Sequence, residues 1–86
     1  MSDSLIQFPA PFTIKAMGRY EEGFELLVFE ILQKHVPGLV RGAMRRKRSR
    51  GGTYMAVSIT FQAESMEQLD EIYRELSRHG KVLMVL

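Results

Sequence analysis

The sequence contains no cysteine and only two histidines among its 86 residues. Without cysteine there can be no disulfide framework, no thiolate nucleophile and no cysteine metal site. No apolar run approaches the roughly 20 residues that a membrane-spanning helix needs. The first residues, MSDSLIQFPAPF, have neither the positive start nor the long apolar stretch of a signal peptide. We therefore expect a cytoplasmic protein that does not enter a membrane.

Side chains suited to catalysis are also scarce. His35 and His79 each end a predicted helix, where the helix dipole favours a cation. No cluster of histidines and carboxylates has the spacing of a metal site. The glycines match neither a phosphate-binding loop nor a dinucleotide-binding motif. The sequence therefore predicts a protein that is not an enzyme, with no catalytic residue, no metal and no cofactor.

The positive charge is concentrated in one segment. Six of the twelve basic residues lie between Arg41 and Arg50, and no acid falls among them. In the rest of the chain six cations face ten acids, so the net charge of +2 conceals a strong asymmetry. Any anionic partner is expected to meet this segment first.

Hydrophobic periodicity indicates six elements in the order β-α-β-β-α-β. Alternating apolar residues predict strands, and apolar residues at helical spacing predict helices that begin at Tyr20 and after Ser65. Glycines at the tip of a hairpin join the two middle strands, and Pro37-Gly38 ends the first helix. The expected strands cover residues 12–17, 40–48, 53–61 and 81–86.

This order predicts an α+β fold, a ferredoxin-like βαββαβ sandwich. It consists of a four-stranded antiparallel sheet of order 4-1-3-2 with two helices on one face. Residues 1–7 are expected to form a flexible N-terminus, and residues 8–86 a single domain. The basic strand would then be an edge strand, where lysine and arginine commonly prevent unwanted pairing.

The hairpin register decides which side of the sheet the cations occupy. We expect Ser49 to oppose Gly52, which places Met44 opposite Val57, Gly42 opposite Ile59 and Val40 opposite Phe61 on the helix-covered side. Arg41, Arg45 and Lys47 would then share the uncovered face with Tyr54, and Lys15 would join them from the neighbouring strand. Arg46 and Arg48 would extend beyond the core at the hairpin tip.

The same fold occurs in RNA-recognition motifs, which stack bases on aromatic residues of the central strands. Arg50, Gly51 and Tyr54 fit the sequence signature of those strands, but its other aromatic positions are unfilled here. The alternative interpretation is a solvated, cationic hairpin that protects a sheet edge. The candidate anion or nucleic-acid patch consists of Lys15, Arg41, Arg45, Arg46, Lys47, Arg48, Arg50 and Tyr54.

Four segments carry a resemblance to a known family: FPAPFTIKAMG (8–18), HVPG (35–38), GGTYMAVSITF (51–61) and VLMVL (82–86). In order and spacing they resemble the YbeD-like family of small, uncharacterised bacterial proteins. The resemblance implies an ACT-like fold, similar to the regulatory domain of phosphoglycerate dehydrogenase. It also implies a regulatory protein that binds lipoic acid. The RRKRSR run lies outside the family pattern.

ACT-type domains commonly bind small ligands where the first strand turns into the first helix, often at a dimer interface. The matching positions are Met17, Gly18 and Arg19. In this interpretation Gly18 admits the ligand, Arg19 binds its carboxylate and free amides at the helix start assist. Alternatively, Gly18 serves only the turn and Arg19 is solvated. The sequence therefore leaves three hypotheses: a regulatory module that senses a small carboxylate such as lipoate or an amino acid, a nucleic-acid binder, and a module for an acidic protein partner or a homodimer.

Overall fold

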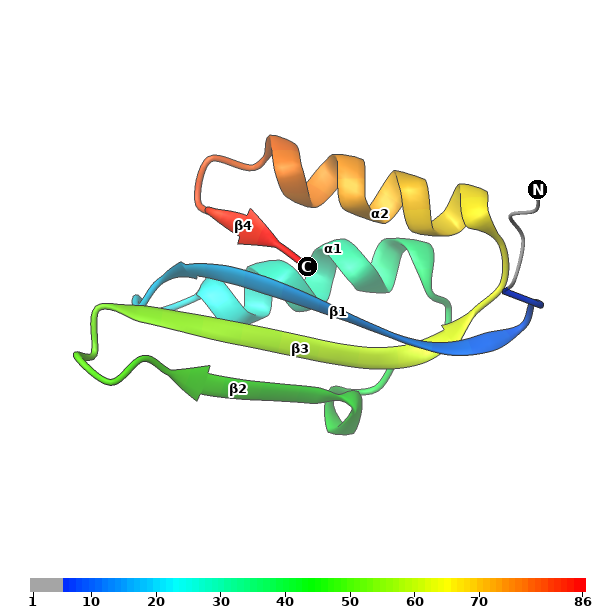
Figure 1. Ribbon diagram of the computed structural model, residues 1–86. Coiled ribbons are helices and arrows are strands. Elements are labelled where there is room, and N and C mark those ends of the chain that lie inside the picture. The colour runs from blue at the N-terminus through cyan, green and yellow to red at the C-terminus, as the bar shows by residue number, and fades with distance from the viewer. Residues whose placement is uncertain (1–5) are drawn as a thin grey trace.

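The computed structural model describes residues 6–86 (Figure 1). The predicted flexibility of the N-terminus concerns residues 1–7, of which 1–5 lie outside the described residues. Residues 6 and 7 form no regular element. The elements are β1 (Ala10–Arg19), α1 (Phe24–His35), the short 3-10 helix η1 (Arg41–Ala43), β2 (Met44–Arg48), β3 (Tyr54–Ala63), α2 (Met66–Arg78) and β4 (Met84–Val85).

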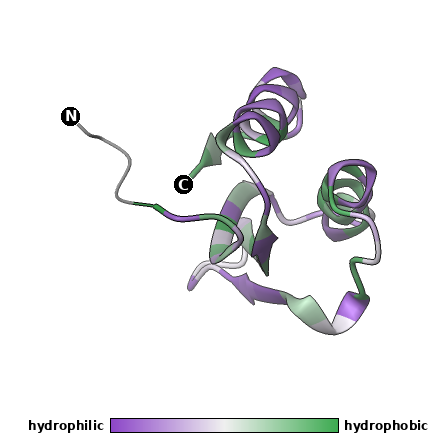
Figure 2. Cartoon of the chain, turned by 90° about the vertical axis from the view of Figure 1, so that its right-hand side faces the viewer, coloured by the Kyte–Doolittle hydropathy of each residue, from purple (hydrophilic) through white to green (hydrophobic). Residues whose placement is uncertain are grey.

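The strands form one antiparallel sheet in the order β2-β3-β1-β4. This is the predicted order 4-1-3-2 written from the other edge, so the expected α+β fold is confirmed. Both helices lie on one side of the sheet, as the view along the strands shows (Figure 2). In Figure 1, β1 and β3 cross in front of α1, so the uncovered face of the sheet is turned toward the viewer. We call this side the open face.

The core lies between the sheet and the helices. Every second residue of β3 from Met55 to Phe61 is buried, as are Ile14 and Ala16 of β1. The helices contribute their apolar stripes, including Phe24, which is only 1% exposed. No polar or charged side chain is buried among the described residues. The period of two therefore assigns each strand residue either to the core or to the open face.

The first helix begins four residues later than predicted. It starts at Phe24, and Gly23 precedes it with φ 90° instead of lying inside it. A left-handed residue cannot continue a right-handed helix, and glycine is the residue that adopts this conformation without strain. Glu21 and Glu22 therefore belong to the turn before the helix and not to its first turn.

The hairpin register differs from the predicted one by two residues. Met44 pairs with Ile59 instead of Val57, and the Ser49 N–H donates to Tyr54 O at 2.8 Å. The connecting loop therefore spans residues 50–53. Gly52 has a positive φ in this loop, and its N–H donates to the backbone O of Ser49 at 2.9 Å. A shift of two residues keeps every side chain on its predicted face of the sheet.

Strand β2 begins at Met44 and does not extend back to Val40 as predicted. Residues 41–43 form η1 instead, so the expected pairs of Gly42 with Ile59 and of Val40 with Phe61 are absent. Val40 is 65% exposed. Arg41 consequently leaves the sheet, and its predicted place on the open face is wrong.

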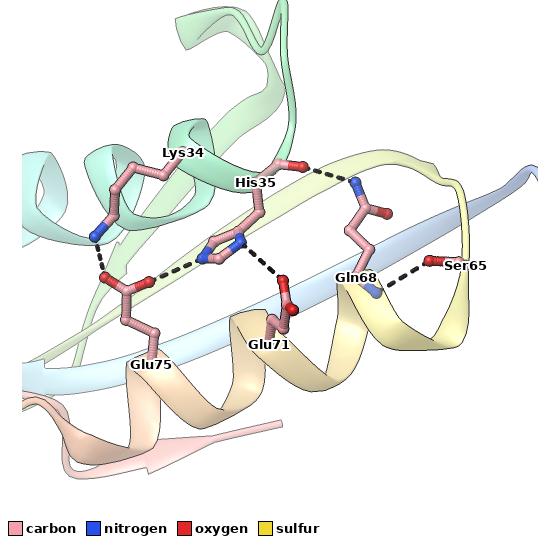
Figure 3. Close-up of polar contacts among 6 residues, drawn as sticks. All are labelled: Lys34, His35, Ser65, Gln68, Glu71 and Glu75. Atoms are coloured by element: carbon pink, nitrogen blue, oxygen red, sulfur yellow. Dashed lines mark hydrogen bonds and ion pairs between the residues drawn. The ribbon is translucent and has the colours of Figure 1, made fainter.

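The second helix begins after Ser65, as the sequence predicts, and Ser65 caps it. Ser65 Oγ accepts a hydrogen bond from the Gln68 N–H at 3.1 Å (Figure 3). Gln68 Oε1 accepts from the Glu64 N–H at 2.8 Å. Gln68 also donates through Nε2 to the backbone O of His35 at 2.8 Å. One side chain therefore caps α2 and ties it to the end of α1.

A charged cluster joins the two helices farther along (Figure 3). Glu75 of α2 accepts from Lys34 and lies 2.8 Å from Nε2 of His35, whose Nδ1 is 3.7 Å from Glu71. The Lys34 ammonium, followed by His35, lowers the pKa of Glu75 below its ordinary value of 4.5. The Glu75 side chain is 27% exposed, so the interaction is partly shielded from solvent.

Replacing Glu75 with glutamine is expected to lower the free energy of unfolding at pH 7 by about 0.5–1 kcal/mol. A carboxylate with a depressed folded pKa contributes stability above its ordinary pKa and loses it as the pH falls through the folded value. The difference between the two proteins should therefore shrink below pH 4.5. Urea unfolding at pH 7 and at several acid pH values measures it. Glu30→Gln is the control, because Glu30 forms no ion pair within residues 6–86, and an equal loss in both variants would contradict the prediction.

Candidate binding surface on the open sheet face

Cross-strand pairing sets the residues of the open face side by side in rows. Ser58 of β3 lies between Arg45 on β2 and Lys15 on β1. Ala56 lies in the same way between Lys47 and Met17, and Met17 pairs with Met84 of β4. The open face comprises Pro11, Thr13, Lys15, Met17, Arg19, Arg45, Lys47, Tyr54, Ala56, Ser58, Thr60, Gln62, Met84 and Leu86, the last of which exchanges backbone hydrogen bonds with Lys15.

The charged side chains of this face are all cations. The strands contain no acidic residue, since every described aspartate and glutamate lies in a helix or in a segment between elements. Four cations project from it, namely Lys15, Arg19, Arg45 and Lys47, and none forms an ion pair within residues 6–86. Because no acidic side chain of the strands offsets them, their fields add over the face and extend about one Debye length, roughly 8–10 Å, into solvent.

The cations flank a shallow track along β3. Two strand spacings separate β1 from β2, which is about 10 Å. Between them β3 presents only the small side chains of Ala56 and Ser58, followed by Thr60. The Thr60 hydroxyl is hydrogen-bonded to that of Thr13 at 2.8 Å. Long cationic side chains thus stand on both sides of a low floor.

The track ends at a hollow beside the hairpin. The hollow has a volume of about 520 Å³, and it is lined by Met17, Lys47, Arg48, Ser49, Arg50, Tyr54, Met55 and Ala56. Tyr54 is 46% exposed and pairs across the sheet with Arg19. An aromatic ring, an apolar floor and several cations therefore meet at one end of the open face.

The rest of the basic run faces the helices instead. Arg46 forms an ion pair with Glu25 of α1, and the hydrogen bond within this pair raises the pKa of Arg46. The Arg48 guanidinium lies 4.0 Å from the centroid of the Tyr20 ring. The prediction that Arg46 and Arg48 extend past the core at the tip is wrong, because they pair with Val57 and Met55 inside the sheet.

Arg41 also contacts the helical layer. Its guanidinium lies 5.5 Å from the centroid of the Phe29 ring of α1. Three members of the predicted patch, Arg41, Arg46 and Arg48, thus make contacts within the protein. The patch that stays available on the open face and at its hairpin end consists of Lys15, Arg45, Lys47, Arg50 and Tyr54, and Arg19 joins it.

A larger groove of about 770 Å³ lies between β2 and the turn before α1. It contains Arg46 and Arg48 with their partners Glu25 and Tyr20. Its arginines are therefore already engaged, and its acids oppose an anion. We place the candidate surface on the open face for this reason.

The predicted ligand residues Met17, Gly18 and Arg19 do not converge on one site. Met17 and Arg19 lie on the open face, whereas Gly18 is buried toward the helices. A Cβ at Gly18 would lie 2.6 Å from Cζ of Phe24 and 2.6 Å from the backbone O of Lys81. The close approach at Gly18 is therefore made by the protein itself. The N–H of Tyr20, which follows Arg19, donates to Thr53 O at 2.8 Å and so is not free to bind a ligand.

Residues 6–86 contain neither a candidate metal site nor a helix suited to span a membrane. No group of three or more histidine, aspartate or glutamate side chains in this part of the chain could hold a metal ion. No helix among these residues is long and apolar enough to cross a membrane.

Comparison with known proteins places the chain in a family. Residues 3–86 match the model of the family described as "Protein of unknown function (DUF493)". The chain belongs to this family. It is 40% identical over 83 residues to the UPF0250 protein of Leptothrix cholodnii, and this match covers 96% of this chain and 91% of that protein. It is 37% identical over 84 residues to UPF0250 protein RSc0326 of Ralstonia nicotianae, covering 98% and 87%. The YbeD-like resemblance predicted from the sequence is thus confirmed.

A solved structure supports the fold. The solution structure of protein HP0495 from H. pylori is similar to this DUF493 chain with a TM-score of 0.72 and 13% sequence identity. The match covers 98% of this chain and 88% of that one. At this identity the likeness shows that both proteins share the arrangement of sheet and helices.

Proposed function

We propose that this DUF493 protein is a non-catalytic binding domain that holds an anionic partner on the open face of its sheet. The observation that carries the proposal is the set of four cations, Lys15, Arg19, Arg45 and Lys47, which share strands without any acidic side chain and form no ion pair within residues 6–86. Like charges held together repel each other in the free protein. A bound anion removes that repulsion, and thus gains affinity from it.

A small carboxylate is a second candidate partner, and the hollow at the hairpin favours it. Met17 and Ala56 offer an apolar floor, while Lys47 and Arg50 offer cations at its rim. A short apolar acid such as lipoate presents the matching chemistry, with a hydrocarbon part and one carboxylate. An amino acid fits less well, because its ammonium group would lie among cations.

Reversing two charges tests the proposal. The variant Arg45→Glu, Lys47→Glu should bind a fluorescent single-stranded dodecamer at least about 25-fold more weakly at 0.1 M salt, since each lost phosphate contact costs roughly a factor of five there. The native protein should show a slope of log affinity against log salt near −3, as about four contacts predict. Fluorescence anisotropy measures both, with polyglutamate and lipoate as competing probes.

The matched control is Arg74→Glu, Arg78→Glu, which makes the same change of net charge on α2, away from the open face. Neither arginine forms an ion pair within residues 6–86. Equal weakening in both variants would assign the binding to net charge alone. If none of the three probes binds the native protein, the proposal is wrong.

A further inference from the structure

The geometry of the open face points to a class of partner, and this step rests on the proposed function. We propose that the partner is a single-stranded nucleic acid whose backbone runs along β3, between the cations of β1 and β2, with one base stacked on Tyr54. The track, its flanking charges and the ring at its end form a continuous surface on adjacent strands.

The floor of the track favours a sugar-phosphate backbone over a protein helix. An amphipathic acidic helix needs an apolar strip beneath it, but after Ala56 the floor continues with the hydroxyls of Ser58 and Thr60. Hydroxyl groups are ordinary partners of phosphate and sugar oxygens. The flanking cations, about 10 Å apart across β3, reach a backbone from both sides.

The shape of the sheet favours a single strand over a duplex. A duplex is read by a helix or a two-stranded ribbon that enters its major groove. Here β1 pairs with β3 from Ala63 to Tyr54, over its whole length, so the β2-β3 hairpin is not a separate ribbon. A cationic sheet face with one exposed tyrosine instead matches the stacking platforms of single-strand binders.

Tyr54 supplies the contact that a charged surface alone lacks. Tyr54 is 46% exposed and lines the hollow, and its cross-strand partner is Arg19, which forms no ion pair within residues 6–86. A base placed there would stack on the ring while its flanking phosphates lie near Arg19 and Lys47. The hollow has room for one base beside the apolar floor of Met17 and Ala56.

Anisotropy with a single-stranded dodecamer tests the stacking step. Tyr54→Ala should weaken binding by about 5- to 150-fold, the range of one lost stacking contact, while Tyr54→Phe should bind as the native protein does. Inorganic polyphosphate, which has no bases, should bind both variants equally. If Tyr54→Ala binds the dodecamer as tightly as Tyr54→Phe, or if a duplex binds more tightly than the single strand, the inference is overturned.

A second pair of variants tests the track without changing charge. Ala56→Leu raises the floor between Met17 and Lys47 and should weaken dodecamer binding by at least fivefold. Gln62 lies on the same strand and face but beyond the cations, so Gln62→Leu should leave binding unchanged. Equal affinities would overturn the proposed path along β3. Polyglutamate that binds better than the dodecamer and is lost with Arg45→Glu, Lys47→Glu would keep the proposed function and replace the nucleic acid with an acidic protein.

Discussion

Replacing Gly18 with alanine is expected to lower the free energy of unfolding by about 3 kcal/mol, at the upper end of the usual cost of overpacking a core. The added methyl group would lie 2.6 Å from Cζ of Phe24 and 2.6 Å from the backbone O of Lys81. The Phe24 ring is 1% exposed and has no room to retreat. For a domain of this size the loss corresponds to a fall in melting temperature of roughly 12 °C or more. Thermal and urea unfolding measure it directly.

Gly51→Ala is the matched control, because no atom lies within 4 Å of its Cβ position and its φ is not positive. It should change stability by less than about 0.5 kcal/mol. Combining Gly18→Ala with Phe24→Leu separates the two clashes, since a smaller side chain relieves only the contact with the ring. A Gly18→Ala protein as stable as the control would mean that Gly18 is not tightly packed, and would reopen the predicted ligand site there.

The role of Gly18 illustrates what sequence could not supply. A glycine between a strand and a helix predicts either a turn or an approach by a ligand, and the sequence offers both interpretations. The groups that fill the space belong to Phe24, in the next element, and to Lys81, far along the chain. Only the folded arrangement brings them together, so no local pattern could distinguish packing from binding.

The strand order and the faces of the strands were predictable for a physical reason. Alternating burial repeats every two residues, so even a register error of two leaves Arg45 and Lys47 on the open face. Positions along the strand are less well determined, because they depend on the loop. The turn closed by Gly52 onto Ser49 takes two residues more than expected. This difference moved Arg46 and Arg48 from the tip to the side of α1.

The sequence predicts the charge of the candidate surface but not all of the residues that form it. The absence of acids from every predicted strand was visible in the sequence and would have indicated a face of one charge. Arg19 was assigned to a different site, because the first strand was expected to end before Gly18. In the structure β1 continues to Arg19, which pairs with Tyr54 and so joins the open face. The contacts of Arg46 with Glu25 and of Arg48 with Tyr20 depend on tertiary packing, which no short motif encodes.

The register itself can be tested with disulfides, because the chain has no cysteine of its own. The variant Arg45→Cys, Ser58→Cys should form a crosslink under oxidising conditions, since the two residues are Cα partners. Opposed residues lie about 4.5–5.5 Å apart between Cα atoms, within the range that a disulfide spans. The closed loop of about 14 residues should raise the free energy of unfolding by about 3 kcal/mol, and a reductant should remove the gain. Mass spectrometry and urea unfolding measure the two effects.

The comparison variant is Arg45→Cys, Ala56→Cys. These two residues would be cross-strand partners in the register predicted from the sequence, with Ser49 opposite Gly52. In the observed register they are diagonal neighbours about 7–8 Å apart, which is too far for an unstrained disulfide. The outcome also bears on binding, because the register decides which cations face each other across β3. A crosslink with Ala56 in place of Ser58 would move Arg45 about 7 Å toward the hairpin and out of the row that it shares with Lys15. Lys47 would then lie opposite Tyr54 in the row of Arg19, and Ser58 in the middle of the track would have a cation on the β1 side only, which removes the basis for a backbone held from both sides there.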